Sequence, residues 1–223
     1  MNILERNSYL RYNKGEKLLF FKRGRHTVIL QRIKNLFSVI PILKTERLLL
    51  RQMRVSDAGD MYEYSCVPAV SRFLLWSPHP NVAHTKRYLN YLQTQYKAGD
   101  HYDWAVVLRD SGKMIGTCGF AKIDAENNAA ELGYVLNPRF WHRGYATEAA
   151  QAVIRFGFEE LLLNRIEARY MEENTESLRV MERLGMSFEG FRRKAVLIKG
   201  EYETVGVCSV LKSEYEKQRS ECL

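Results

Sequence analysis

The segment from residue 130 to residue 149 constrains the fold of this chain most, because a strand, a turn and a helix follow one another in it. Residues 130–136 are mostly apolar, residues 141–144 form a basic turn ending in Gly144, and helical spacing begins near Tyr145. Apolar or small residues keep that spacing at Ala146, Ala149, Ala150, Val153, Ile154, Gly157 and Leu161. One face of this helix must therefore be buried against another layer.

A strand that enters a helix through a glycine turn can bind an anion. The first helical turn has unpaired backbone N–H groups and about half a positive charge from the helix dipole. Gly144 allows a phosphate to come close, and a diphosphate would fit. The chain lacks the GxxxxGK[ST] run and has one glycine where the dinucleotide fingerprint needs three. The simpler alternative is that Gly144 only starts the helix.

The remaining patterns predict one layered domain. Predicted strands cover 47–53, 104–109, 114–122, 130–136, 164–170, 187–198 and 202–211, and predicted helices follow Asp57, cover 83–96 and 145–161, and run from Asn174 to Leu184. This order predicts an α/β (α+β) fold in which a mixed, mostly antiparallel sheet carries helices on both faces.

The positive charge is concentrated at the N-terminus. Residues 1–43 hold nine Lys or Arg and two Glu, a net +7, and the rest of the chain holds 25 basic and 24 acidic residues. We expect a basic extension over 1–43, a main domain over 44–215 and a tail over 216–223. The extension is either a hairpin with an amphipathic helix over 31–42 or a partly ordered leader that packs on a neighbouring surface. A basic segment of this kind can contact RNA, a ribosome or a membrane surface.

Composition narrows the class of protein further. The four cysteines, Cys66, Cys118, Cys208 and Cys222, are widely spaced and form no metal-binding pattern. We expect no metal, no transmembrane segment and no signal peptide, and therefore a cytoplasmic location. The oligomeric state is left open between a monomer and a homodimer.

Several motifs resemble the GNAT acetyltransferase superfamily. Residues 141–149, Trp-His-Arg-Gly-Tyr-Ala-Thr-Glu-Ala, are similar to its acetyl-CoA pyrophosphate loop, [QR]xxGx[GA], with Trp141 where Gln or Arg is usual. Residues 174–190 resemble the next helix and strand of that superfamily. Residues 45–51 and 199–202 are similar to the branch that includes ribosomal-protein N-terminal acetyltransferases.

The resemblance implies acetyl-CoA as the acetyl donor and a splayed central strand pair. It implies that the pyrophosphate is held by the backbone amides of His142, Arg143, Gly144, Tyr145, Ala146 and Thr147. It also implies that Tyr134, Val135 and Leu136 splay at a bulge and pair with the pantetheine arm, and that Asn174 lies near its reactive end.

Direct attack by an amine is the simplest chemistry, because no GxSxG elbow or paired Cys and His supports a covalent intermediate. Glu131 is the candidate base, and its alternative is an ion pair or a solvated face. Ser177 is the candidate acid, and its alternative is an ordinary first-turn residue. Many superfamily members carry a tyrosine where this chain has Met181.

The acceptor is expected to bind to the stretch between residues 56 and 96, and Trp76 and Glu131 are the candidate acceptor-binding residues. The leading prediction is an N-acetyltransferase acting on a protein or peptide α-amine. Two alternatives stay open. One is an enzyme for a small-molecule amine, such as an antibiotic or polyamine. The other is a weakly catalytic CoA-binding protein that docks to RNA or a ribosome through its basic extension.

Overall fold

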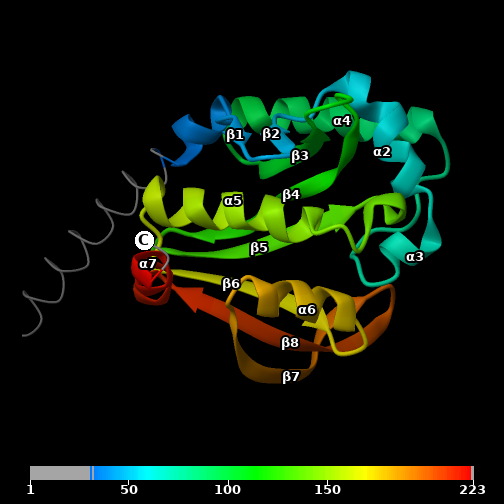
Figure 1. Cartoon of the computed structure of the whole chain (residues 1–223). Coiled ribbons are helices and arrows are strands. Elements are labelled where there is room, and N and C mark those ends of the chain that lie inside the picture. Colours follow the sequence, from blue (N-terminus) through cyan, green and yellow to red (C-terminus); the bar gives the residue numbers. More distant parts are fainter. Residues whose placement is uncertain (1–30, 32, 222–223) are drawn as a thin grey trace, which may run out of the picture.

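A computed structural model of the chain describes residue 31 and residues 33–221, which form one mixed sheet with helices on both faces (Figure 1). The strand order is β1-β2-β3-β4-β5-β6-β8-β7. The strands are β1 Leu43–Lys44, β2 Leu48–Arg51, β3 Tyr102–Leu108, β4 Met114–Asp124, β5 Ala129–Leu136, β6 Arg165–Met171, β7 Ser187–Ile198 and β8 Glu201–Leu211. The predicted fold class is confirmed.

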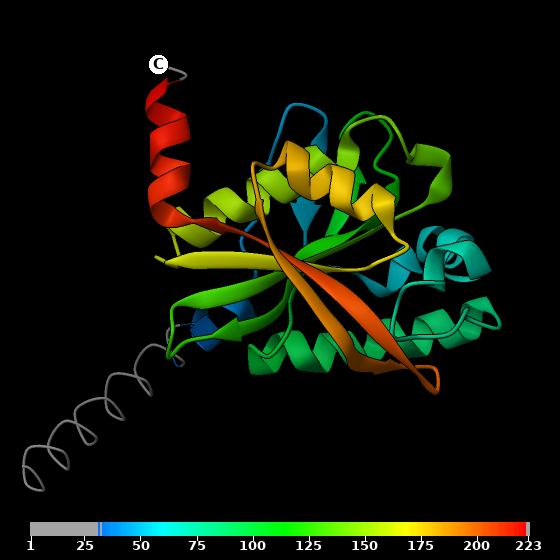
Figure 2. The ribbon, with the colours of Figure 1, turned by 90° about the horizontal axis from the view of Figure 1, so that it is seen from below.

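The helices lie in two layers. They are α2 Ala58–Ser65, α3 Pro68–Ser71, α4 Val82–Ala98, α5 Tyr145–Glu159, α6 Thr175–Arg183 and α7 Lys212–Glu221, with short 3-10 turns at Val55–Asp57 and Pro138–Phe140. Figure 2 shows α5 and α6 on one face of the sheet and α4 on the other. No helix in the described part of the chain is long and apolar enough to cross a membrane.

The central strands β5 and β6 pair only over part of their length. They are parallel, and their pairing runs from Ala129 opposite Arg165 to Leu132 opposite Ala168. The last residues of β5 therefore have an edge that is not paired with β6, as the resemblance implied. The predicted bulge lies elsewhere. The register shift occurs in β4 at Ala121, because this strand has one more residue than β5 there, while residues 134–136 pair with β4 without interruption.

Part of the predicted N-terminal extension belongs to the hydrophobic core. Residues 33–38 are helical, and the rings of Tyr102, Trp104 and Phe156 surround the fully buried Phe37 at centroid distances of 4.9, 5.4 and 6.0 Å. The indole N–H of Trp104 donates to the Pro41 carbonyl at 2.7 Å. The predicted hairpin before residue 31 lies outside the described residues, and the division at residue 43 stays a prediction. At the other end, α7 crosses the expected boundary at residue 215.

Replacing Phe37 with Ala should lower the free energy of unfolding by roughly 3 kcal/mol, because it leaves a cavity among three aromatic rings. Urea unfolding followed by fluorescence would measure this change. Val39→Ala is the matched control, because Val39 lies two residues away and is 80% exposed. A loss of unfolding free energy in Phe37→Ala no larger than that in Val39→Ala would show that burial of Phe37 does not stabilise the domain.

Candidate active site

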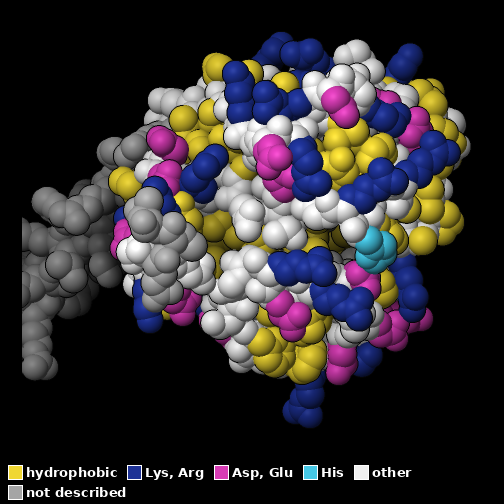
Figure 3. All heavy atoms as spheres, viewed as in Figure 1, with side chains coloured by type: hydrophobic (Ala, Val, Ile, Leu, Met, Phe, Trp, Pro, Cys, Tyr) yellow, Lys and Arg dark blue, Asp and Glu magenta, His cyan; other side chains and the backbone are white. Residues whose placement is uncertain are grey.

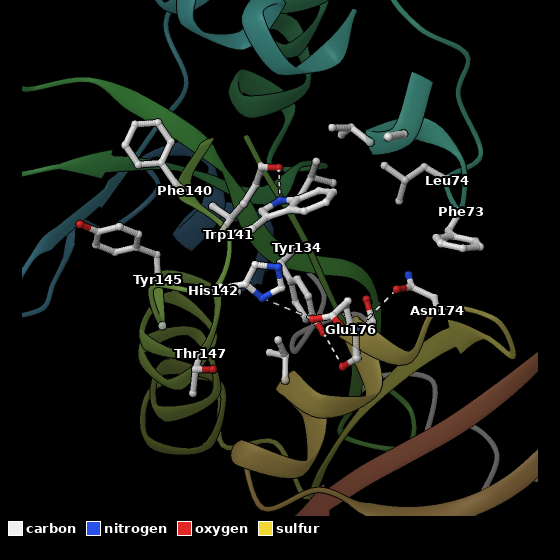
Figure 4. A pocket seen from close by; sticks show the side chains of 18 of the residues that line it. Phe73, Leu74, Tyr134, Phe140, Trp141, His142, Tyr145, Thr147, Asn174 and Glu176 are labelled. Atoms are coloured by element: carbon white, nitrogen blue, oxygen red, sulfur yellow. Dashed lines mark hydrogen bonds and ion pairs between the residues drawn. The ribbon is translucent and has the colours of Figure 1, made fainter. Parts of the chain in front are cut away.

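A cavity of about 350 Å³ lies where β5 ends and α5 begins. Its walls come from α3, the end of β5, the turn before α5, and α6, as Figure 4 shows. Figure 3 shows this face of the molecule, where Lys and Arg side chains gather on both sides of a hollow with apolar side chains in it. The site therefore combines an apolar interior with a basic rim.

Ten of the predicted site residues line this cavity. They are Tyr134, Val135, Leu136, His142, Gly144, Tyr145, Ala146, Thr147, Asn174 and Ser177. Arg143, Glu131 and Trp76 are not among the lining residues. The carbonyl of Arg143 faces Arg47, and Trp76 is partly buried with its ring 5.6 Å from that of His79. The cavity brings together predicted residues that are distant in the sequence, such as Tyr134 and Ser177, which are 43 positions apart.

The turn before α5 has the geometry of an anion site. His142 and Gly144 both have a left-handed backbone, with φ of 58° and 78°. The first hydrogen bond of α5 joins the Glu148 N–H to the Gly144 carbonyl at 3.0 Å. The N–H groups of residues 145–147 precede that bond, so they are the orphan donors of the helix start.

Trp141, which stands where the superfamily usually has Gln or Arg, has a structural role in this turn. Its indole N–H donates to the Leu136 carbonyl at 2.8 Å. This bond ties the turn to the end of β5, and it places the indole in the cavity wall (Figure 4). The departure from the motif therefore adds a contact between the two elements that form the site.

Glu131 lies on the opposite face of β5 from Leu132, which is buried in the core. It stands in the last part of β5 that still pairs with β6. Burial raises the pKa of its carboxyl above the ordinary value, although the Arg169 guanidinium, 3.5 Å away, opposes this shift. Glu131 is thus ion-paired and partly desolvated, and its role as the base stays a prediction.

Asn174 and Ser177 begin α6 at the cavity wall. The side chain of Asn174 accepts the Ser177 N–H at 3.2 Å and so caps the helix. The hydroxyl of Tyr134 donates to the Ser177 carbonyl at 3.1 Å, and burial raises the pKa of this tyrosine. The hydroxyl is therefore a protonated group inside the cavity. The sequence analysis placed Tyr134 at the pantetheine edge but gave its hydroxyl no role.

The sequence analysis also missed two other parts of the site. The short helix α3 and the residues after it contribute Ala69, Val70, Arg72, Phe73 and Leu74 to the wall. No motif recognised in the sequence predicted these contacts. Across the cavity, the ring of His142 lies 3.6 Å from the Glu176 carboxylate on α6 (Figure 4).

Among the described residues, no group of three His, Cys, Asp or Glu could hold a metal ion.

Comparison with known proteins places this geometry in a family. The family model described as Acetyltransferase (GNAT) domain matches residues 47–187. The uncharacterized N-acetyltransferase p20 of Bacillus licheniformis is 36% identical over 173 residues, which is 78% of this chain and 97% of that protein. The [ribosomal protein uS5]-alanine N-acetyltransferase of Escherichia coli is 27% identical over 72% of this chain and 85% of its own length.

A solved structure gives the same result for the fold. The crystal structure of a GNAT-family acetyltransferase from Bacillus anthracis has a TM-score of 0.70 and 30% sequence identity to this chain. The match covers 78% of this chain and all of the other. The strand, turn and helix that form the cavity lie within the region that the family model matches. This chain is therefore a member of the GNAT acetyltransferase family.

Proposed function

We propose that this N-acetyltransferase takes its acetyl group from acetyl-CoA and transfers it to the α-amine of a protein or peptide in the cytoplasm. GNAT enzymes use acetyl-CoA as donor, and the observation that supports its binding here is the cavity beside the start of α5. The protein acceptor is supported by the similarity to an enzyme named for the alanine of ribosomal protein uS5. A small-molecule amine is the alternative acceptor.

The donor would lie along the elements that meet at the cavity. The diphosphate would bind the amides of residues 142–147, where the helix start provides both N–H donors and positive potential. The pantetheine arm would run beside residues 134–136, because β5 has lost its pairing with β6 there. Asn174, on the far wall, would lie near the thioester.

The reaction needs a neutral amine as nucleophile. At pH 7, removing its proton costs roughly 1 kcal/mol for an α-amine but about 4–5 kcal/mol for lysine. Glu131 would accept this proton, since its raised pKa brings the carboxylate closer to the operating pH. The amine nitrogen then attacks the thioester carbonyl, the C–S bond breaks, and CoA leaves as a thiolate.

The thiolate must finally receive a proton. Ser177 is the proposed donor, and the Tyr134 hydroxyl, which donates to the Ser177 carbonyl, is a second protonated group at the cavity. A thiolate with a pKa of about 8.5, by analogy with cysteine, needs only modest help. The proton donor should therefore contribute less to the rate than the base.

Ser177→Ala should lower kcat about tenfold, less than the usual contribution of a general acid, because the thiolate is a good leaving group. Release of free thiol from acetyl-CoA would measure the rate. The control is Ser187→Ala, because Ser187 is an exposed residue of β7 away from the cavity. If Ser177→Ala has normal turnover and Tyr134→Phe is slow, Tyr134 is the donor instead.

The acceptor is identified by a panel of amines. Thiol release should be fastest with peptides that have a free N-terminal Ala or Ser, and slow with N-terminally blocked peptides that contain lysine. Faster turnover of polyamines or aminoglycosides would contradict the peptide proposal and support the small-molecule alternative.

The RNA or ribosome contact proposed for the basic extension needs its own test. Deleting residues 1–43 is unsuitable, because it would remove the buried Phe37 from the core. Replacing Lys22, Arg23 and Arg25 with Gln removes three positive charges of the extension and keeps Phe37. Salt-dependent RNA binding that these substitutions abolish would support the contact, and binding that they leave unchanged would contradict it.

A further inference from the structure

Arg47 connects the strand β2 side of the sheet to the turn that begins α5. Its Nε donates to the Glu148 carboxylate at 2.6 Å, and its Nη1 donates to the Arg143 carbonyl at 3.0 Å. Its guanidinium carbon lies 4.4 Å from the centroid of the Tyr145 ring. Because residues 143 and 145 flank Gly144, one side chain contacts both sides of the glycine.

Glu148 anchors the other end of this connection. Its carboxylate also accepts the Thr45 hydroxyl at 2.6 Å and the Arg47 backbone N–H at 2.9 Å. Burial alone would raise the pKa of Glu148, but the hydrogen bonds from Thr45 and Arg47 hold it below the ordinary value. The group is thus a carboxylate in the first turn of α5.

The negative charge of Glu148 lies close to the proposed diphosphate site, and Arg47 forms an ion pair with it. An unpaired carboxylate in the first helical turn would repel a diphosphate bound at the same end of the helix. Arg47 pairs with this carboxylate through a planar fork that Lys cannot reproduce. An added Cβ at Gly144 would lie 3.4 Å from the Arg47 guanidinium, so the positive charge is also close to the turn itself.

We propose that Arg47 is a positioning residue for the acetyl donor: it fixes the 142–147 turn in its binding geometry and neutralises Glu148 beside the diphosphate. This inference rests on the proposed binding of acetyl-CoA at that turn. It predicts that Arg47 acts on the phosphates of the donor and not on its pantetheine arm.

Arg109 provides a matched control. Its Nη1 donates to the carbonyls of Thr45 and Glu46 at 2.8 and 2.9 Å, so it holds the same loop that carries Arg47. Its hydrogen bonds go to this loop and not to the turn before α5. Arg109→Gln and Arg47→Gln therefore remove the same charge near the same loop, but only Arg47→Gln removes contacts with the turn before α5.

Isothermal titration with CoA should show affinity about tenfold weaker for Arg47→Gln and within about twofold of wild type for Arg109→Gln, from the usual value of a charge-assisted hydrogen bond. The ratio of kcat/KM for acetyl-CoA to that for S-acetylpantetheine, which lacks the phosphates, should fall about as much in Arg47→Gln and stay constant in Arg109→Gln.

The outcomes separate this inference from the proposed function. If the wild-type protein gives no heat with CoA, the proposed donor site is wrong. If wild type binds CoA and the two glutamine variants bind it equally well, the role of Arg47 is wrong. Arg47→Lys is the milder variant should Arg47→Gln fail to fold. It keeps the charge but loses the fork, so it should weaken binding at least about threefold, and wild-type affinity would overturn the inference.

Discussion

Gly144→Val should weaken CoA binding on the order of 100-fold. The backbone φ at Gly144 is 78°, a left-handed conformation that is particularly unfavourable for a β-branched residue. The proposed binding of CoA uses this conformation, because it would direct the N–H groups of the turn toward the anion. Binding must then overcome a backbone strain of up to about 3 kcal/mol, which corresponds to a loss of affinity on the order of 100-fold. Isothermal titration with CoA measures it directly.

Gly112→Val is the control for this substitution. Gly112 also has a positive φ, 70°, and a Cβ there would meet no atom within 4 Å. It lies in the turn between β3 and β4, so it carries the same kind of backbone strain without touching the cavity. An equal loss of CoA affinity in both variants, or wild-type affinity in Gly144→Val, would contradict the proposed anion site.

Glu131→Gln should lower kcat/KM for the acceptor by about 100-fold or more, the usual contribution of a general base. The carboxylate accepts a proton only when it is ionised. In the wild type, kcat/KM should therefore rise as pH increases through the pKa of Glu131, which burial raises above its ordinary value. The variant should lose this rise and keep the one due to the amine at higher pH. CoA affinity should not change.

The control is Glu167→Gln. Glu167 stands opposite Glu131 in the β5–β6 register and shares Arg169, which lies 2.8 Å from it. This substitution disturbs the same ionic network without removing the proposed base. A wild-type rate and pH profile in Glu131→Gln would assign Glu131 to the ion pair alone, and an equal loss in both variants would assign the effect to the network.

The local elements of the site could be predicted because each has a signal within a few residues. Gly144 marks the start of α5, and Asn174 caps α6 where its side chain could be expected to accept an N–H three residues later. Gly99 ends α4 with a left-handed backbone, as its place after the helical pattern indicates. These features follow from short-range sterics and hydrogen bonding.

Other elements had no usable local signal. The helix α3 has only four residues, too few to show a helical period, yet it brings neighbouring side chains into the cavity wall. The helix α7, Lys212–Glu221, is almost entirely polar and so resembles a tail. The place of residues 33–40 in the core could not be predicted, because their apolar side chains find partners far along the chain, such as Trp104.

By itself, then, the sequence determined the strand, glycine turn and helix around Gly144, and with them the prediction of an anion site. Only the tertiary structure decided where β5 and β6 separate, that Arg169 lies beside Glu131, and that Arg47 reaches Glu148 from 101 positions away. The physical reason is that helix starts and turns depend on neighbouring residues. The partner of a buried or charged side chain depends on how the whole sheet brings distant segments together.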